Sequence, residues 1–140
     1  MKITQSYGVK FKGGYKAVKR TIAIFNDAVN YLITPVQDNY DAIAVLDTSL
    51  KKMNYVEKLV HHTKGNKAVY DFDNKFYKFP SYLRRSAITK VVGIVSSYMS
   101  QMNNWKANNC KGAMPKLDMG NHLMPCFYKD NMFDHQNDKT

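Results

Sequence analysis

The feature that most constrains the fold is a long amphipathic segment that follows Pro80. Over residues 82–106 apolar side chains recur every three or four positions, the pattern of an α-helix with a broad buried face. Such a helix would be about 25 residues and roughly 38 Å long, with Ser81 placed to cap its first turn. In a chain of 140 residues it must form the spine of the core. Gly93 within it suggests close approach by another element.

The segments before this helix predict one strand and two shorter helices. Alternating apolar residues over 3–12 are typical of a half-buried strand that ends at the paired glycines 13–14. An apolar stripe over residues 15–32 predicts a helix, which Pro35 should stop shortly afterwards. Asp47 or Thr48 would cap the next helix. After residue 108 the chain turns irregular, and residues 126–128 predict a short strand.

Charge separates along the chain and indicates a polyanionic partner. The 21 Lys and Arg residues exceed the 11 Asp and Glu residues, giving a formal charge of +10. Residues 1–26 and 74–117 contain basic residues and no acid, so each could focus positive potential on part of the surface. Nucleic acid is therefore the leading partner, and a generically solvated lysine-rich surface is the alternative. Only three of the basic residues are arginines, which favours contacts with the phosphate backbone over base-edge recognition.

Aromatic residues crowd into the segment 70–82 and leave two interpretations open. They are interleaved with lysines and followed by two arginines, a mixture that can stack bases while holding phosphates. They can equally pack on the long helix and leave the cations in water. The six aromatic residues are Tyr70, Phe72, Phe76, Tyr77, Phe79 and Tyr82.

No motif in the sequence predicts a catalytic residue, a metal site or a cofactor. The imidazoles of His61 and His62 would leave a helix about 100° apart and could not readily share a metal ion. The two cysteines, at positions 110 and 126, read as free thiols. Asp71 and Asp73 could lie on one side of an extended segment, as in two-metal hydrolases, but no third acid supports that hypothesis. No apolar run is long enough to cross a bilayer and no signal core follows Met1, so we expect a cytoplasmic protein without a membrane partner.

Several runs in the sequence resemble the N-terminal portion of TnpB-type (OrfB-like) proteins of insertion sequences. The first group is FPSYLRRSAI at 79–88, GIVSSY at 93–98 and NW at 104–105. The second is MPKL at 114–117 with PCFYKDNMF at 125–133, and the opening MKIT is also similar.

The resemblance implies an RNA-guided DNA endonuclease whose N-terminal half is a wedge of antiparallel strands interrupted by a helical recognition lobe. On this mapping residues 1–133 form one α+β domain that is predominantly helical. The helical lobe 15–107 is inserted between a strand at 3–12 and returning strands at 114–133, and residues 134–140 are a polar tail. The RuvC-like nuclease domain and zinc ribbon of that family have no counterpart in these residues, so we expect no enzyme activity.

We therefore expect a non-catalytic nucleic-acid-binding module, the N-terminal part of a transposase. It would bind the sugar-phosphate backbone of structured RNA, DNA or an RNA–DNA hybrid. The alternative is a protein-interaction fragment that forms a homo-oligomer or pairs with the rest of a transposase. The residues expected to contact nucleic acid are Lys10, Lys12, Lys16, Lys19, Arg20, Arg84, Arg85 and Lys90.

Overall fold

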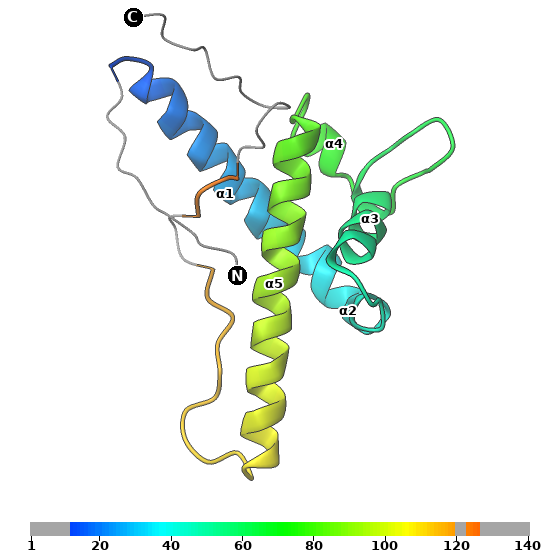
Figure 1. The fold of residues 1–140 in the computed structure, drawn as a ribbon, viewed down its shortest axis with the longest axis vertical. Helices are drawn as coiled ribbons and strands as arrows, with labels where there is room; N and C mark the ends of the chain where they lie inside the picture. Colours follow the sequence, from blue (N-terminus) through cyan, green and yellow to red (C-terminus); the bar gives the residue numbers. More distant parts are fainter. Residues whose placement is uncertain (1–11, 120–122, 127–140) are drawn as a thin grey trace, which may run out of the picture.

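The computed structural model describes residues 12–119 and 123–126, and this part of the chain is helical (Figure 1). Helices account for 64% of it. The five helices are α1 (Tyr15–Asp38), α2 (Tyr40–Ala44), α3 (Ser49–Val60), α4 (Phe72–Lys75) and α5 (Ser81–Ala107). The only β-type pairing among these residues is an isolated bridge between Thr63 and Asn66, which closes the turn predicted at residues 65–66.

The predicted α+β class is wrong, because the described residues contain helices and no strand. Of the expected strand at 3–12 only Lys12 is described, and it lies in a bend. The expected returning strands at 114–133 are described at 114–119 and 123–126, and neither piece is a strand. The backbone of 123–126 bonds to side chains of α1 and α5 instead. Residues 123–126 are therefore held against helices and not within a sheet. The remainder of these segments and the tail 134–140 lie outside the described residues.

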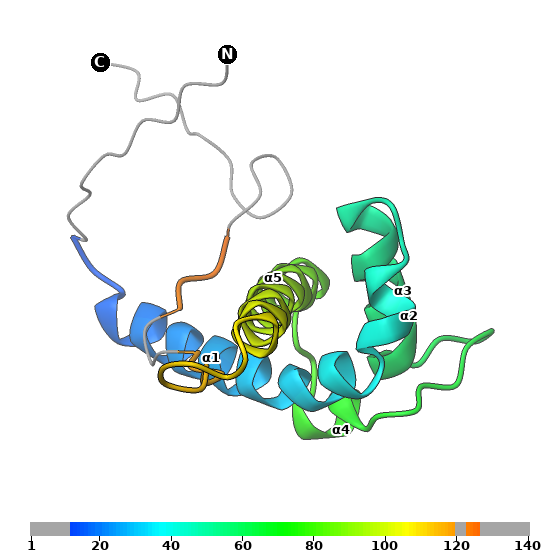
Figure 2. The same ribbon diagram turned by 90° about the horizontal axis from the view of Figure 1, so that it is seen from below.

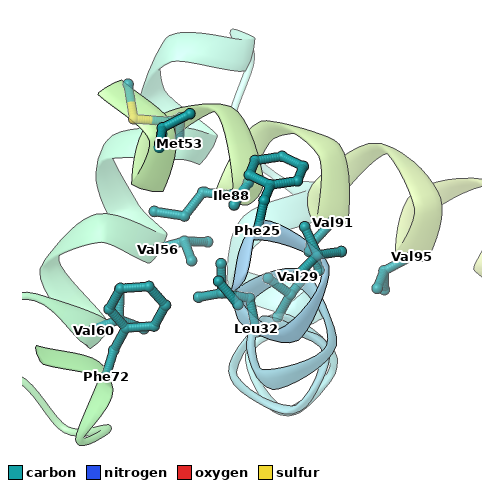
Figure 3. Close-up of a cluster of buried hydrophobic side chains, with 14 of the residues drawn as sticks. Phe25, Val29, Leu32, Met53, Val56, Val60, Phe72, Ile88, Val91 and Val95 are labelled. Carbon is teal, nitrogen blue, oxygen red and sulfur yellow. The ribbon is translucent and has the colours of Figure 1, made fainter. Parts of the chain in front are cut away.

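Helix α5 is the spine predicted by the sequence, and the core lies between its N-terminal half, α1 and α3 (Figures 1 and 3). Phe25, Val29 and Leu32 of α1 face Ile88 and Val91 of α5 in this core, where all five are fully buried. The C-terminal half of α5 extends beyond the other helices (Figure 1). The predicted close approach at Gly93 is wrong, since an added Cβ there would meet nothing within 4 Å.

Helix α1 continues past the proline that was expected to stop it. Pro35 lies inside α1, which ends at Asp38. A proline ring inside a helix removes one hydrogen bond and costs about 3 kcal/mol. Here Leu32, Pro35 and Val36 are all buried, and their packing outweighs that cost. The side-chain amide of Asn39 donates to the carbonyl of Pro35 at 2.8 Å and so satisfies one of the last acceptors of the helix.

Helix α3 follows the sequence prediction at both its cap and its buried face. The hydroxyl of Thr48 accepts a hydrogen bond from the backbone N–H of Lys51 at 3.2 Å, which is the expected N-cap. Met53, Val56 and Val60 are its buried residues. The chain then returns to α3, because the N–H groups of residues 69 and 70 both donate to the carbonyl of Leu59.

None of the described helices is both long enough and apolar enough to cross a membrane.

Candidate nucleic-acid interface

The first turns of α1 and the residues just before them carry a cluster of exposed cations with no acid among them. Lys12, Lys16, Lys19 and Arg20 are all exposed, and the first acid of the chain is Asp27. The Nζ atom of Lys19 lies 4.6 Å from the centre of the Tyr15 ring. The buried face of α1 begins only at Phe25, so this end of the helix is free to present its charge. We call these four residues the α1 cationic surface. Lys10, the remaining predicted residue of this block, lies outside the described residues.

The arginine at position 84 has a structural environment that the sequence did not reveal. Its side chain is only 7% exposed, and its Nη2 atom donates to Oε1 of Glu57 at 3.0 Å. Arg85 shares the same carboxylate through Nε, at 3.2 Å from Oε2, but its side chain is 45% exposed. The guanidinium of Arg84 is therefore held inside the protein, whereas that of Arg85 reaches the surface.

Lys90 is half-buried beside the C-terminal segment. Its Nζ atom donates to the carbonyl of Met124 at 3.2 Å. This contact holds the ammonium against residues 123–126, so Lys90 helps to fix that segment to α5.

The structure does not gather the predicted cations into one interface. The N-terminal half of α1 and helix α3 lie on opposite sides of α5 in both views (Figures 1 and 2). Arg84 and Arg85 bond to Glu57 of α3, so they belong to the α3 side. The cations at the start of α1 and the two arginines of α5 thus lie in separate regions, and Lys90 lies beside residues 123–126.

The α3 side contains a groove that sequence reasoning missed. It has a volume of about 550 Å³ and lies between α3, the turn that follows it and the first turns of α5. We call it the α3–α5 groove. Its charged lining includes Lys58, which the sequence analysis did not single out. The sequence did not identify Lys58, because its groove neighbours on α5, Ser81, Arg84 and Arg85, lie 23 or more positions further along the chain. The lining residues are Asn54, Glu57, Lys58, His61, Thr63, Asn66, Ser81, Arg84 and Arg85.

The aromatic residues of segment 70–82 mostly pack inside the protein. Phe72 is fully buried, and its ring contacts those of Tyr31, Phe76 and Phe79 at centroid distances of 4.7 to 5.8 Å. Tyr77 is different, because it is 77% exposed and Nζ of Lys78 lies 5.3 Å from its ring centre. The packing interpretation therefore holds for the phenylalanines, and Tyr77 is the aromatic residue of this segment left most open for stacking.

The two aspartates considered for metal-dependent hydrolysis bond to separate partners. Asp73 accepts hydrogen bonds from Nδ1 of His61 at 2.9 Å and from the backbone N–H of His62 at 2.9 Å. Asp71 accepts one from the side chain of Asn74 at 2.7 Å. Within residues 12–119 and 123–126, no group of three or more His, Cys, Asp or Glu residues is arranged to hold a metal ion.

The comparisons with known proteins identify the family to which the chain belongs. A model of the Aq_aa04 family matches residues 4–140, so the chain belongs to the Aq_aa04 family. Neither the curated proteins nor the solved structures include a match.

Proposed function

We propose that this member of the Aq_aa04 family is a nucleic-acid-binding protein that contacts the phosphate backbone through its α1 cationic surface. The observation that carries the proposal is the exposed, acid-free start of α1, where Lys16, Lys19 and Arg20 precede the buried part of the helix and Lys12 lies just before the helix. Cations placed in this way bind phosphates by releasing condensed counterions, with little dependence on base sequence.

The similarity to TnpB-type proteins suggests which nucleic acid to test first. A module resembling their recognition region would hold structured RNA or an RNA–DNA hybrid by its A-form backbone. The wedge strands that the resemblance implies are absent from the described residues. The proposal therefore rests on the charge and exposure of α1, and the resemblance serves only to rank the ligands.

The experiment is a binding titration of the whole chain against single-stranded RNA, structured RNA, duplex DNA and RNA–DNA hybrid at several salt concentrations. The test variant changes Lys16, Lys19 and Arg20 to Gln. Its matched control changes Lys106, Lys111 and Lys116 to Gln, since these lysines are also exposed and the loss of charge is the same. For duplex DNA, losing three phosphate contacts should reduce the slope of log K against log salt by up to about 3.

We expect the α1 variant to bind all sequences of the preferred ligand more weakly, with a shallower salt slope than its control. Equal losses in both variants would mean that binding follows net charge alone, and would overturn the α1 surface as the site. A concentration-dependent dimer without affinity for any of the four ligands would instead support the protein-interaction alternative.

A further inference from the structure

We propose that the α3–α5 groove is a second phosphate-binding site, which holds a phosphodiester group of the nucleic acid backbone. This proposal rests on the proposed function for the polymer that supplies the phosphate. It concerns different residues: the groove is lined by α3 and α5, and α3 lies on the other side of α5 from the N-terminal half of α1 (Figure 2). Its physical basis is an excess of positive charge in a confined space.

The charge balance of the groove is set by one carboxylate and three cations. Glu57 is the only acid among the lining residues, which also include Lys58, Arg84 and Arg85. The imidazole of His61 is itself bonded to Asp73. The three cations outnumber Glu57 and Asp73 together, so the groove keeps a net positive charge and an anion is the ligand it attracts.

Glu57 holds the two arginines so that only one of them is left for a ligand. Its Oε1 atom accepts from Nε and Nη2 of Arg84, at 3.3 and 3.0 Å. Its Oε2 atom accepts from Nε of Arg85 at 3.2 Å. Within the part of the chain that the structure describes, the Nη groups of Arg85 have no partner. An arginine fixed through Nε with free Nη donors is positioned to bind a phosphate oxygen.

Lys58 supplies the second free cation. It follows Glu57 on α3, its side chain is exposed, and its ammonium has no partner among residues 12–119 and 123–126. Ser81 of α5 and Thr63 of the turn add hydroxyl groups to the lining from the other elements. Charged and neutral donors thus converge from α3, α5 and the turn between α3 and α4.

The lining also indicates which part of a nucleic acid the groove accepts. A volume of about 550 Å³ is within the usual range for small-ligand sites. The lining contains no Phe, Tyr or Trp residue, so it offers no platform on which a base could stack. The groove should therefore bind the phosphate group and make no contact that depends on the identity of the base.

The test compares the wild-type chain with a variant carrying Lys58→Gln and Arg85→Gln. Glu57 and Arg84 are kept so that the buried ion pair survives, and a circular dichroism melt checks the fold. The control carries Lys106→Gln and Lys111→Gln, toward the other end of α5. The probes are inorganic phosphate, a nucleoside monophosphate and the preferred oligonucleotide, followed by amide chemical shifts and by titration.

We expect the oligonucleotide to shift the amide signals of Ser81 and Thr63 in the wild-type protein. The groove variant should lose these shifts and bind the oligonucleotide at least about tenfold more weakly than the control, as expected for two lost phosphate contacts. A groove variant that binds like its control, with no shifts at Ser81 and Thr63, would overturn the groove site. It would leave the α1 surface and the proposed function intact.

Two further outcomes would show whether the phosphate belongs to a small molecule or to a nucleic acid, and which surface binds it. Shifts at the groove with inorganic phosphate or the monophosphate, without oligonucleotide binding, would support a phosphate site for a small molecule. That result would contradict both the polymer source and the proposed function. Loss of oligonucleotide affinity in the groove variant but not in the α1 variant would support the groove and remove α1 as the contact surface.

Discussion

The side chain of Asn26 forms two hydrogen bonds with the backbone of Leu123, a residue 97 positions further along the chain. Its Nδ2 atom donates to the Leu123 carbonyl at 3.0 Å, and its Oδ1 atom accepts from the Leu123 N–H at 3.0 Å. This buried amide satisfies both backbone groups of Leu123, as a neighbouring strand would do in a sheet. Ser86 of α5 makes a similar contact, since its hydroxyl accepts from the N–H of Cys126 at 3.1 Å. Two helices thus hold residues 123–126 through backbone atoms.

Replacing Asn26 by Leu should release this segment, because Leu has similar volume but cannot bond to the backbone. We expect the free energy of unfolding to fall by about 1–3 kcal/mol, the usual cost of leaving buried polar groups unpaired. Hydrogen exchange at the Leu123 amide should become at least about tenfold faster. Asn30→Leu, at an exposed position of the same helix, is the control. Unchanged exchange at Leu123 in the Asn26 variant would contradict this role.

Loss of the ion pair between Glu57 and Arg84 should lower the free energy of unfolding strongly. Glu57→Ala leaves a buried guanidinium without its anion, which typically costs 3–5 kcal/mol. Arg84 is 7% exposed and Glu57 14%, so solvent can compensate little. The double variant Glu57→Leu, Arg84→Met should recover much of the loss, because apolar residues of similar size can replace a buried pair.

Urea denaturation measures both effects. The exposed pair of Asp47 with Lys51, whose Nζ and Oδ1 atoms are 2.8 Å apart, provides the comparison. Asp47→Ala should change the free energy of unfolding by no more than about 0.5 kcal/mol, as for other exposed i,i+4 pairs. A Glu57→Ala loss as small as this would show that Arg84 finds water or another partner.

The positions of the helices could be predicted where the local pattern of apolar residues favours the same helix bounds as the packing of the core. The bounds of α5 follow its apolar stripe closely, and Thr48 caps α3 as its residue type suggests. The end of α1 was not predictable, because Pro35 is unfavourable locally and only the buried surface around it makes the longer helix stable. The resemblance to TnpB-type proteins assigned residues 123–126 to returning strands, but their backbone bonds to a side-chain amide of α1, a long-range contact that no local pattern indicates.

The candidate site likewise has features that the sequence predicts and features that it does not. The exposed cations of α1 follow from the sequence, because a helix stripe places them away from the apolar face. The environment of Arg84 does not, since the carboxylate that sequesters it is 27 residues earlier. Adjacent arginines on α5 therefore have different roles, one within the protein and one at its surface. That distinction depends on the packing of α3 against α5, which no local pattern encodes.

The aromatic cluster around α4 predicts a large difference between two nearby aromatic residues. Phe72→Ala removes a fully buried ring that contacts three others, so we expect a loss of about 3–5 kcal/mol in the free energy of unfolding. Tyr77→Ala should change it by less than about 0.5 kcal/mol, because the side chain is largely exposed. Thermal and urea unfolding check both values. A similar loss in the two variants would contradict the packing role assigned to Phe72.

Tyr70 connects the end of α1 to the segment before α4 and should make the fold sensitive to alkali. Its hydroxyl donates to Oδ2 of Asp38 at 3.1 Å and accepts from Nδ2 of Asn39 at 3.2 Å. Burial, with a further contribution from Asp38, raises the pKa of Tyr70 above its usual value of 10.0, although the Asn39 hydrogen bond opposes this. Burial and the charge of Asp71 likewise raise the pKa of Tyr31.

These shifts fix the direction of the pH dependence. Above about pH 10 the unfolded chain releases tyrosine protons that the folded protein still holds, so the unfolded state is favoured as pH rises. The stabilising contribution is fully present below the unfolded pKa and is lost as pH rises through the folded pKa. Urea denaturation between about pH 9 and 11 should therefore show stability falling with pH, less steeply in Tyr70→Phe and Tyr31→Phe. A wild-type slope in both variants would exclude these two tyrosines as its cause.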